Sequence, residues 1–237
     1  MLEYITTMKT IGLIGGMSYE STIPYYKIIN DEVNKALGGL HSAKVVLYSV
    51  DFDEIESRQR SNDWDECGQI LKNAAISLEK AGADIILICT NTMHKVFQDV
   101  QAGVKVPVLH IAKATASKLI ESNVKKVALL GTIYTMTQDF YKSVLIESGL
   151  EVVIPDDIQM QEINRIIFEE LCKGKIVDSS REYFSKVIDS LKAKGAQAVI
   201  LGCTEIGLLV TEDKSALKVF DTTVIHAKAA VEAALKQ

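Results

Sequence analysis

Short, nearly continuous apolar runs alternate with longer amphipathic stretches along the 237-residue chain. Runs such as Lys9–Gly15 (KTIGLIG), Ala43–Val50 (AKVVLYSV) and Asp84–Cys89 (DIILIC) are typical of strands buried on both faces. This alternation predicts an α/β fold with parallel sheets, in which ligands bind at the carboxyl ends of the strands. The other predicted strands are Val106–His110, Lys126–Gly131, Leu150–Ile154, Ala198–Cys203 and Lys218–Phe220, and the predicted helices are Thr22–Leu37, Asp65–Lys80, Ala112–Ser122, Gln138–Ser148, Met160–Lys173, Ser179–Lys194 and Val224–Lys236.

The chain also repeats itself weakly. Lys9–Gly16 (KTIGLIGG) resembles Lys125–Thr132 (KKVALLGT), and Gly82–Asn91 (GADIILICTN) resembles Gly195–Thr204 (GAQAVILGCT). Any parallel α/β protein contains similar strand–turn–helix units, but the matched order and spacing favour a duplication. We therefore predict a first α/β domain at residues 1–107, completed by a C-terminal helix at 214–237, and a second α/β domain at 108–213.

Composition excludes several classes of partner. The net charge of −5 is mild and no Lys/Arg cluster is present, so no nucleic acid and no anionic membrane surface is expected as a partner. No apolar run approaches the roughly 20 residues of a membrane helix, and the N-terminus lacks signal-peptide features. The four cysteines include no CxxC pair, which favours reduced thiols. The prediction is a soluble, cytoplasmic protein.

Two of the predicted strand ends carry a thiol beside hydroxyl or amide side chains. They are Cys89-Thr90-Asn91-Thr92 and Gly202-Cys203-Thr204-Glu205, at equivalent places in the repeat. If the halves face one another, these two strand ends meet at one cleft. Two acid/base groups on opposite sides of a cleft can remove a proton from one face of a carbon atom and return it to the other face. A lone strand-end cysteine is more often a small buried hydrophobic residue, but the pairing favours the catalytic interpretation.

Three segments resemble the signature of the aspartate/glutamate racemase family: Gly12–Ser18 (GLIGGMS), Thr90–His94 (TNTMH) and Gly202–Glu205 (GCTE). The resemblance covers the chain from Met8 onward. The chain is most similar to the broad-specificity branch of the family, whose Val-Asp-Phe segment matches Val50-Asp51-Phe52 here. It implies two pseudo-symmetric, flavodoxin-like parallel-sheet domains with the active site between them. It also implies an amino-acid substrate, no cofactor (neither pyridoxal phosphate nor metal), a two-base mechanism with one thiol from each domain, and a homodimer.

One departure from the family's pattern changes the expected mechanism. The alignment places Thr90, and not Cys89, at the first catalytic thiol, while Cys203 matches the second. Neighbouring side chains of a strand point to opposite faces, so Cys89 is expected to face the core. The expected catalytic pair is therefore Thr90 and Cys203. The resemblance implies a broad racemase of acidic amino acids (aspartate or glutamate). Because the family's second thiol serves the L face and Cys203 matches it, we expect the activity to be asymmetric between L- and D-substrates.

The resemblance also assigns substrate contacts one residue at a time. Met17 and Ser18 resemble the pocket floor, Thr132 and Thr135 are their counterparts in the second half, and Asn91, Thr92 and Thr204 resemble ligands of the α-carboxylate. Gln59 stands where strictly aspartate-specific members use Arg. Arg165 is a candidate for binding a side-chain carboxylate, although a solvated helix charge is an equal alternative. Glu205 and His94 are expected to orient the bases or relay protons, with a structural role for His94 an equal alternative.

Other functions fit parts of the pattern. A one-thiol enzyme of the same superfamily, such as a malonate-type decarboxylase, needs only Cys203 and a hydroxyl-rich pocket. A ligand-binding α/β protein without catalysis would also have duplicated halves. The Gly12-x-x-Gly15-Gly16 loop does not match the GxGxxG fingerprint, which argues against a dinucleotide enzyme.

Overall fold

The computed structural model describes residues 8–236 and divides into two compact units. In the described part, the first unit holds residues 8–89, 96–110 and 226–236, and the second holds 90–95 and 111–225. The predicted domains instead placed residues 90–95 and 214–225 with the first half and residues 108–110 with the second. Residues 1–7 and 237, which the predicted first domain includes, lie outside the described residues.

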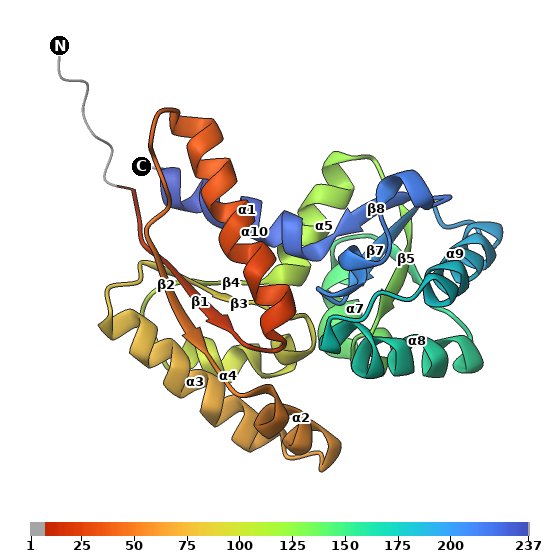
Figure 1. The fold of residues 1–237 in the computed structure, drawn as a ribbon, viewed down its shortest axis with the longest axis horizontal. Helices are drawn as coiled ribbons and strands as arrows, with labels where there is room; N and C mark the ends of the chain where they lie inside the picture. The colour runs from red at the N-terminus through yellow and green to blue at the C-terminus, as the bar shows by residue number, and fades with distance from the viewer. Residues whose placement is uncertain (1–7, 237) are drawn as a thin grey trace. The chain divides into compact units, whose positions relative to one another are not determined.

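The first unit contains a four-stranded parallel sheet in the order β2-β1-β3-β4. The strands are β1 (Ile11–Gly15), β2 (Val45–Ser49), β3 (Ile85–Ile88) and β4 (Val108–Leu109). Figure 1 shows α1 (Tyr19–Leu37) on one side of this sheet and α3 (Trp64–Lys80) on the other. Two shorter helices complete the unit, α2 (Phe52–Arg60) and α4 (Phe97–Ala102), together with the end of α10 (Thr222–Leu235).

The second unit repeats this topology. Its parallel sheet has the order β6-β5-β7-β8, with β5 (Lys126–Gly131), β6 (Glu151–Val153), β7 (Ala198–Gly202) and β8 (Lys218–Asp221). The identical strand order supports the predicted duplication, and the two parallel sheets confirm the α/β class. Its helices are α5 (Ile111–Glu121), α6 (Ile133–Thr137), α7 (Asp139–Glu147), α8 (Asp157–Glu169) and α9 (Asp178–Ala193), with short 3-10 turns η2 (Leu171–Lys173), η3 (Ile206–Leu208) and η4 (Glu212–Lys214).

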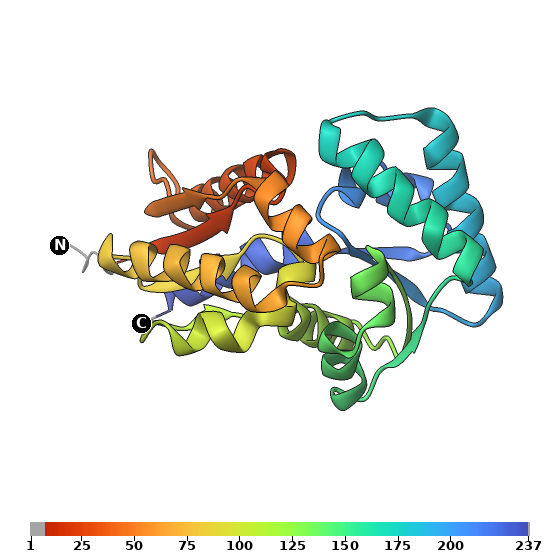
Figure 2. The same ribbon diagram turned by 90° about the horizontal axis from the view of Figure 1, so that it is seen from below.

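Alternation along the central strands of this sheet builds a core on each face. Val127 and Leu129 of β5 pack with α5 and α7, whereas Ala128 and Leu130 pack with α8 and α9. Figure 2 shows α8 and α9, in teal to blue, on the opposite side of the strands from the green α7. Both faces are covered, which explains the continuous apolar runs of the two central strands, Val127–Leu130 and Ala198–Leu201.

The C-terminal stretch 214–237, which the domain prediction calls a helix, is helical only in part. It begins with the end of η4 and the strand β8, where a strand was predicted at Lys218–Phe220, and the helix α10 starts at Thr222, two residues before the predicted helix Val224–Lys236. Asp221 lies before α10, and its Oδ1 accepts hydrogen bonds from the backbone N–H groups of Thr223 and Val224, at 2.8 and 3.3 Å. A carboxylate in this place satisfies the otherwise unpaired N–H groups of a helix start. No helix of residues 8–236 is both long and apolar enough to cross a membrane.

A buried histidine links the helices of the first unit to its sheet. The Tyr25 hydroxyl lies 3.0 Å from His226 Nδ1, and His226 Nε2 lies 3.0 Å from the Leu109 carbonyl oxygen. Since a carbonyl only accepts, Nε2 carries the proton and Nδ1 accepts from Tyr25. Burial lowers the pKa of His226 to about 4, so the ring is neutral near pH 7.

This geometry predicts a loss of stability in acid. The unfolded chain protonates His226 near pH 6.5 but the folded chain only near 4, so between these values the unfolded state binds more protons and stability falls as the pH decreases. We expect His226 to cost about 3 kcal/mol of unfolding free energy by pH 4. Urea unfolding of the wild type and His226→Gln at pH 7, 5.5 and 4 measures this cost. Equal pH slopes in the two proteins would contradict it.

Candidate active site

The sequence-predicted site residues of the second unit gather at the carboxyl ends of β5 and β7. The strand order reverses between these two central strands, and such a switch point is where open parallel sheets bind ligands. Gly131 and Gly202 are paired in register as the last residues of the two strands. Thr132 and Cys203 therefore follow neighbouring strands at the same edge of the sheet.

The loop Thr90–Lys95 follows β3 in the chain but belongs to the second unit. The Thr92 hydroxyl hydrogen-bonds Thr132 Oγ1 at 2.9 Å and lies 3.5 Å from Thr135 Oγ1, and the latter two oxygens are 3.2 Å apart. All three residues are buried. Three hydroxyls in mutual contact can exchange donor and acceptor roles, so together they can bind a carboxylate.

A second contact attaches Asn91 to the same sheet. The Thr222 hydroxyl donates to the Leu201 carbonyl oxygen at 2.8 Å, so its oxygen accepts from Asn91 Nδ2 at 3.0 Å. This fixes the orientation of the Asn91 amide, since only the NH2 group donates. Asn91 Oδ1 is then buried without a hydrogen-bond partner. An unsatisfied buried acceptor is rare, and it suits a ligand that donates hydrogen bonds.

His94 makes the third contact of this loop. The backbone N–H of Ile111 donates to His94 Nε2 at 3.1 Å, so Nδ1 carries the proton and donates to the Thr90 carbonyl oxygen at 2.8 Å. Both ring nitrogens are thus bound to backbone groups. This arrangement favours the structural alternative for His94, in which the ring holds the half-buried Thr90 in place, over a proton relay.

At the end of β7, Cys203 and Thr204 share one acceptor. Cys203 Sγ donates to Glu205 Oε2 at 2.9 Å, and Thr204 Oγ1 donates to the same oxygen at 3.0 Å. Glu205 is 2% exposed. Burial raises the pKa of the Cys203 thiol well above its ordinary value, and the Glu205 carboxylate raises it further. The thiol is therefore protonated at rest, with its proton directed at a carboxylate.

The predicted residues Met17, Ser18 and Gln59 belong to the first unit and are buried there. Ser18 precedes α1, and its carbonyl oxygen accepts hydrogen bonds from the hydroxyls of Ser21 and Thr22. Cys89 is 1% exposed and packs in the apolar core of this unit. Desolvation strongly raises the pKa of its thiol, which agrees with the predicted core-facing role.

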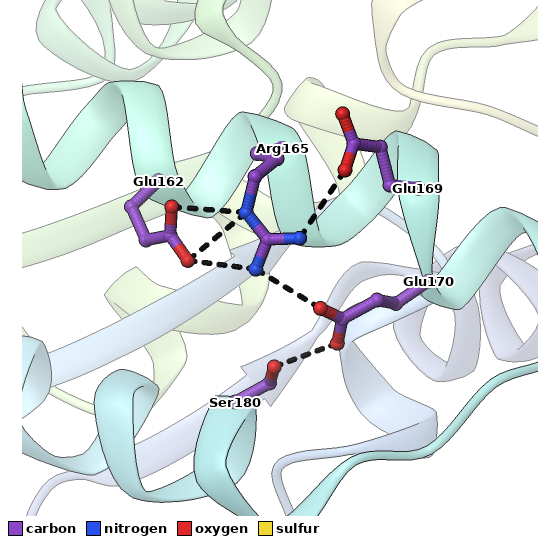
Figure 3. Close-up of polar contacts among 5 residues, drawn as sticks. All are labelled: Glu162, Arg165, Glu169, Glu170 and Ser180. Atoms are coloured by element: carbon purple, nitrogen blue, oxygen red, sulfur yellow. Dashed lines mark hydrogen bonds and ion pairs between the residues drawn. The ribbon is translucent and has the colours of Figure 1, made fainter.

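Arg165 lies on α8 among three carboxylates (Figure 3). Its guanidinium donates to Glu162 at 2.7 to 3.1 Å, to Glu170 at 3.0 Å and to Glu169 at 3.3 Å, and Glu170 also accepts from Ser180. A substrate carboxylate would have to displace one of these partners. The contacts favour the helix-charge alternative, while the predicted binding of a side-chain carboxylate stays a prediction.

Sequence reasoning did not select two residues that the structure connects to this site. Thr222 orients Asn91, and its place after β8 is a strand-end signal of the kind used for the other residues. Cys172 of η2 packs against the core cluster that contains Cys203, and no motif of the sequence marks it. Among residues 8–236, no group of three His, Cys, Asp or Glu side chains is arranged to hold a metal ion.

A duplicated α/β fold with hydroxyl, amide and thiol groups at its strand ends suits enzymes that move protons on small carboxylates. The family model for Asp/Glu/hydantoin racemases matches residues 14–230, and the chain belongs to this family. It is therefore an amino-acid racemase, an isomerase.

Individual relatives agree with this assignment. The broad-specificity amino-acid racemase RacX of Bacillus subtilis is 27% identical, over 93% of this chain and 96% of RacX. Among solved structures, a Yersinia pestis protein provisionally assigned as an Asp/Glu racemase is 55% identical, with a TM-score of 0.89 and coverage of 97% and 100%. An aspartate racemase homologue from Pyrococcus horikoshii is 41% identical, with a TM-score of 0.82 and the same coverage. These relatives do not favour the decarboxylase or the non-catalytic alternative.

The contacts of Arg165 predict the outcome of its removal. We expect Arg165→Gln to change the KM for L-aspartate by less than about twofold, and to lower the unfolding free energy by about 1–2 kcal/mol. The pairs with Glu162 and Glu169 are exposed and contribute little, whereas Glu170 is only 13% exposed and loses a charged hydrogen bond. Steady-state kinetics and urea unfolding measure the two effects. A rise in KM of about tenfold or more would instead support the sequence-based role in substrate binding.

Proposed function

We propose that this racemase inverts the α-carbon of acidic amino acids, aspartate or glutamate, with Cys203 as the base for L-substrates and Thr90 on the other face. The observation that carries this proposal is the 2.9 Å hydrogen bond from the Cys203 thiol to Glu205. The aspartate racemase homologue and the Asp/Glu racemase assignment among its relatives support the substrate class.

The Cys203–Glu205 pair gives a route to a thiolate in a buried site. Cys203 transfers its thiol proton to Glu205 Oε2 and, as thiolate, removes the α-proton of the substrate. The negative charge moves from the carboxylate to the sulfur and then to the substrate carbanion, so no additional charge is buried at any step. Transfer to a neighbouring acceptor thus offsets the raised pKa of the Cys203 thiol, as in other base-activated nucleophiles.

The neighbouring polar groups suit the substrate's backbone. In the proposal, the hydroxyls of Thr92, Thr132 and Thr135 turn their donors to the α-carboxylate, and Thr204 contributes a further hydroxyl. Asn91 was predicted to bind the α-carboxylate, but its Nδ2 already donates to Thr222, so in the proposal its unpartnered Oδ1 accepts a hydrogen bond from the α-ammonium group instead. Met17, Ser18 and Gln59 are proposed to complete the substrate pocket.

The asymmetry between substrates follows from the chemistry of Thr90. A threonine hydroxyl is essentially never ionised near neutral pH, so Thr90 is a poor base toward the D-substrate. In the proposal it returns a proton to the carbanion by receiving one from a water as it gives its own. The proton held on Glu205 then neutralises the hydroxide that is left. The backbone carbonyl of Thr90 is fixed by His94, which keeps the residue in place. The proposed enzyme therefore converts L-substrates readily and D-substrates slowly.

We further propose a cytoplasmic enzyme that needs no cofactor, forms a homodimer and accepts more than one amino acid. The four cysteines are all free thiols, as is typical of a reducing compartment. The broad specificity of RacX supports a wide substrate range.

Exchange of the α-proton in deuterated water tests the mechanism. We expect L-aspartate or L-glutamate to exchange at least about tenfold faster than its D-enantiomer, because only the L face meets a thiol. Cys203→Ala should abolish exchange of the L-substrate, whereas Cys67→Ala, which removes a buried thiol of the first unit, should not. Equal exchange rates for both enantiomers, or activity retained in Cys203→Ala, would exclude the assigned roles.

A further inference from the structure

Thr222 stands at the junction of β8 and α10, and it is not one of the residues assigned to the substrate. Its side chain is fully buried, and its hydroxyl donates to the Leu201 carbonyl oxygen at 2.8 Å. Leu201 pairs with Asp221 in the ladder between β7 and β8, and it shortly precedes Cys203 in the chain. The Thr222 hydroxyl is thereby attached to the strand that carries the proposed base.

The direction of this hydrogen bond decides what Thr222 offers to Asn91. A hydroxyl has one proton, and the Leu201 carbonyl, which can only accept, uses it. The Thr222 oxygen therefore accepts from Asn91 Nδ2, at 3.0 Å, and the amide is held with its NH2 group toward Thr222. Asn91 Oδ1 is then buried without a hydrogen-bond partner among the described residues. Loss of the hydroxyl would remove the group that distinguishes the two ends of this amide.

A role in capping α10 does not account for the Thr222 hydroxyl. The first N–H groups of this helix, those of Thr223 and Val224, donate to Asp221 Oδ1 at 2.8 and 3.3 Å. Thr222 instead directs its hydroxyl at β7 and at Asn91, which is 131 residues away in the sequence. Removal of the hydroxyl should therefore leave the helix start intact and act on the orientation of Asn91.

We propose that Thr222 is a positioning residue that makes the site selective for α-amino acids over the corresponding acids without an amino group. By holding Nδ2, it leaves Asn91 Oδ1 as an acceptor for the substrate's α-ammonium group. Succinate has the two carboxylates of aspartate but no donor on this carbon, so it leaves Oδ1 buried and unsatisfied. This inference rests on the proposed function, in particular on the substrate class and the role of Asn91. Thr222 itself makes no contact with substrate and acts through Asn91.

The role predicts a change of selectivity and not a uniform loss of binding. Without the Thr222 hydroxyl, the Asn91 amide can turn, and its NH2 group then faces the ammonium group of an amino acid. Two donors cannot pair, so L-aspartate loses a charge-assisted hydrogen bond while succinate loses none. The loss of one such bond corresponds to about tenfold in the ratio of the two dissociation constants. A loosened pocket would weaken the binding of both ligands alike.

Thr222→Val and Thr222→Ser form a matched pair, because valine keeps the shape of threonine without the hydroxyl, whereas serine keeps the hydroxyl. Calorimetric titration of the full chain with L-aspartate and with succinate gives the ratio of dissociation constants, in a Cys203→Ala background that prevents turnover. We expect Thr222→Val to reduce the preference for L-aspartate about tenfold, and Thr222→Ser to keep it within about threefold of the background protein. Thr115→Val is the control, since it removes a buried hydroxyl that donates to the Ile111 carbonyl oxygen at 2.8 Å, and it should leave the ratio unchanged.

A double-mutant cycle with Asn91→Leu isolates the path through the amide. Asn91→Leu lacks the acceptor, so it should itself lose the preference for L-aspartate, and adding Thr222→Val should change the ratio no further. An unchanged ratio in Thr222→Val, equal changes in the valine and serine variants, or a full effect of Thr222→Val on top of Asn91→Leu would each overturn the proposal. If Thr222→Val does not fold, a preference that Asn91→Leu leaves intact, or that Thr222→Ser abolishes, would overturn it too.

The same titrations with L-glutamate and glutarate separate this inference from the proposed function. If neither L-aspartate nor L-glutamate binds, the proposed substrate class is wrong, and the role of Thr222 falls with it. If an amino acid binds but the acid without the amino group binds equally well, the role of Thr222 alone is wrong. In that case the proposed roles of Cys203 and Thr90 are still decided by the exchange of the α-proton.

Discussion

The attachment of one short loop to the second unit determines the composition of the candidate site. Thr90–Lys95 continues a strand of the first sheet, yet Asn91, Thr92 and His94 each hydrogen-bond residues of the second unit. Buried hydrogen bonds of this kind are costly to break, because each broken bond leaves an unsatisfied polar group. Thr90 is thereby held by the same unit that carries Cys203. The two groups proposed to act on opposite faces of a substrate are therefore fixed within one compact unit.

The chemistry of the site depends on an electrostatic conflict at Cys203. A buried thiol beside a carboxylate is a poor source of thiolate, since desolvation and repulsion both favour the protonated form. The same carboxylate becomes an advantage if it accepts the proton, because the negative charge is then transferred within the site and not added to it. The geometry suits this second role, as Cys203 and Thr204 both direct their protons at one oxygen of Glu205.

The strands and most residues at their ends were predictable because apolar runs buried on both faces are conspicuous, and parallel sheets place their chemistry at carboxyl ends. The identical order of β2-β1-β3-β4 and β6-β5-β7-β8 explains why the repeat was visible. Contacts formed by the folded chain were not predictable: nothing in the sequence shows that Thr222 orients Asn91 or that three glutamates surround Arg165. Helix α2 was missed because only Ile55 and Gln59 of its nine residues are buried, so it lacks an apolar period.

The register of β3 explains why the first half cannot restore its missing thiol with Cys89. Alternate residues of the strand face opposite sides, and Cys89 follows Ile85 and Leu87 into the core that contains Tyr25 and Ile29. A shift by one residue would bring Cys89 to the position of Thr90, but it would also exchange every side chain of the strand between its two buried faces, each of which is packed for the present order. The proposed mechanism therefore has a hydroxyl at one face of the substrate and a thiol at the other.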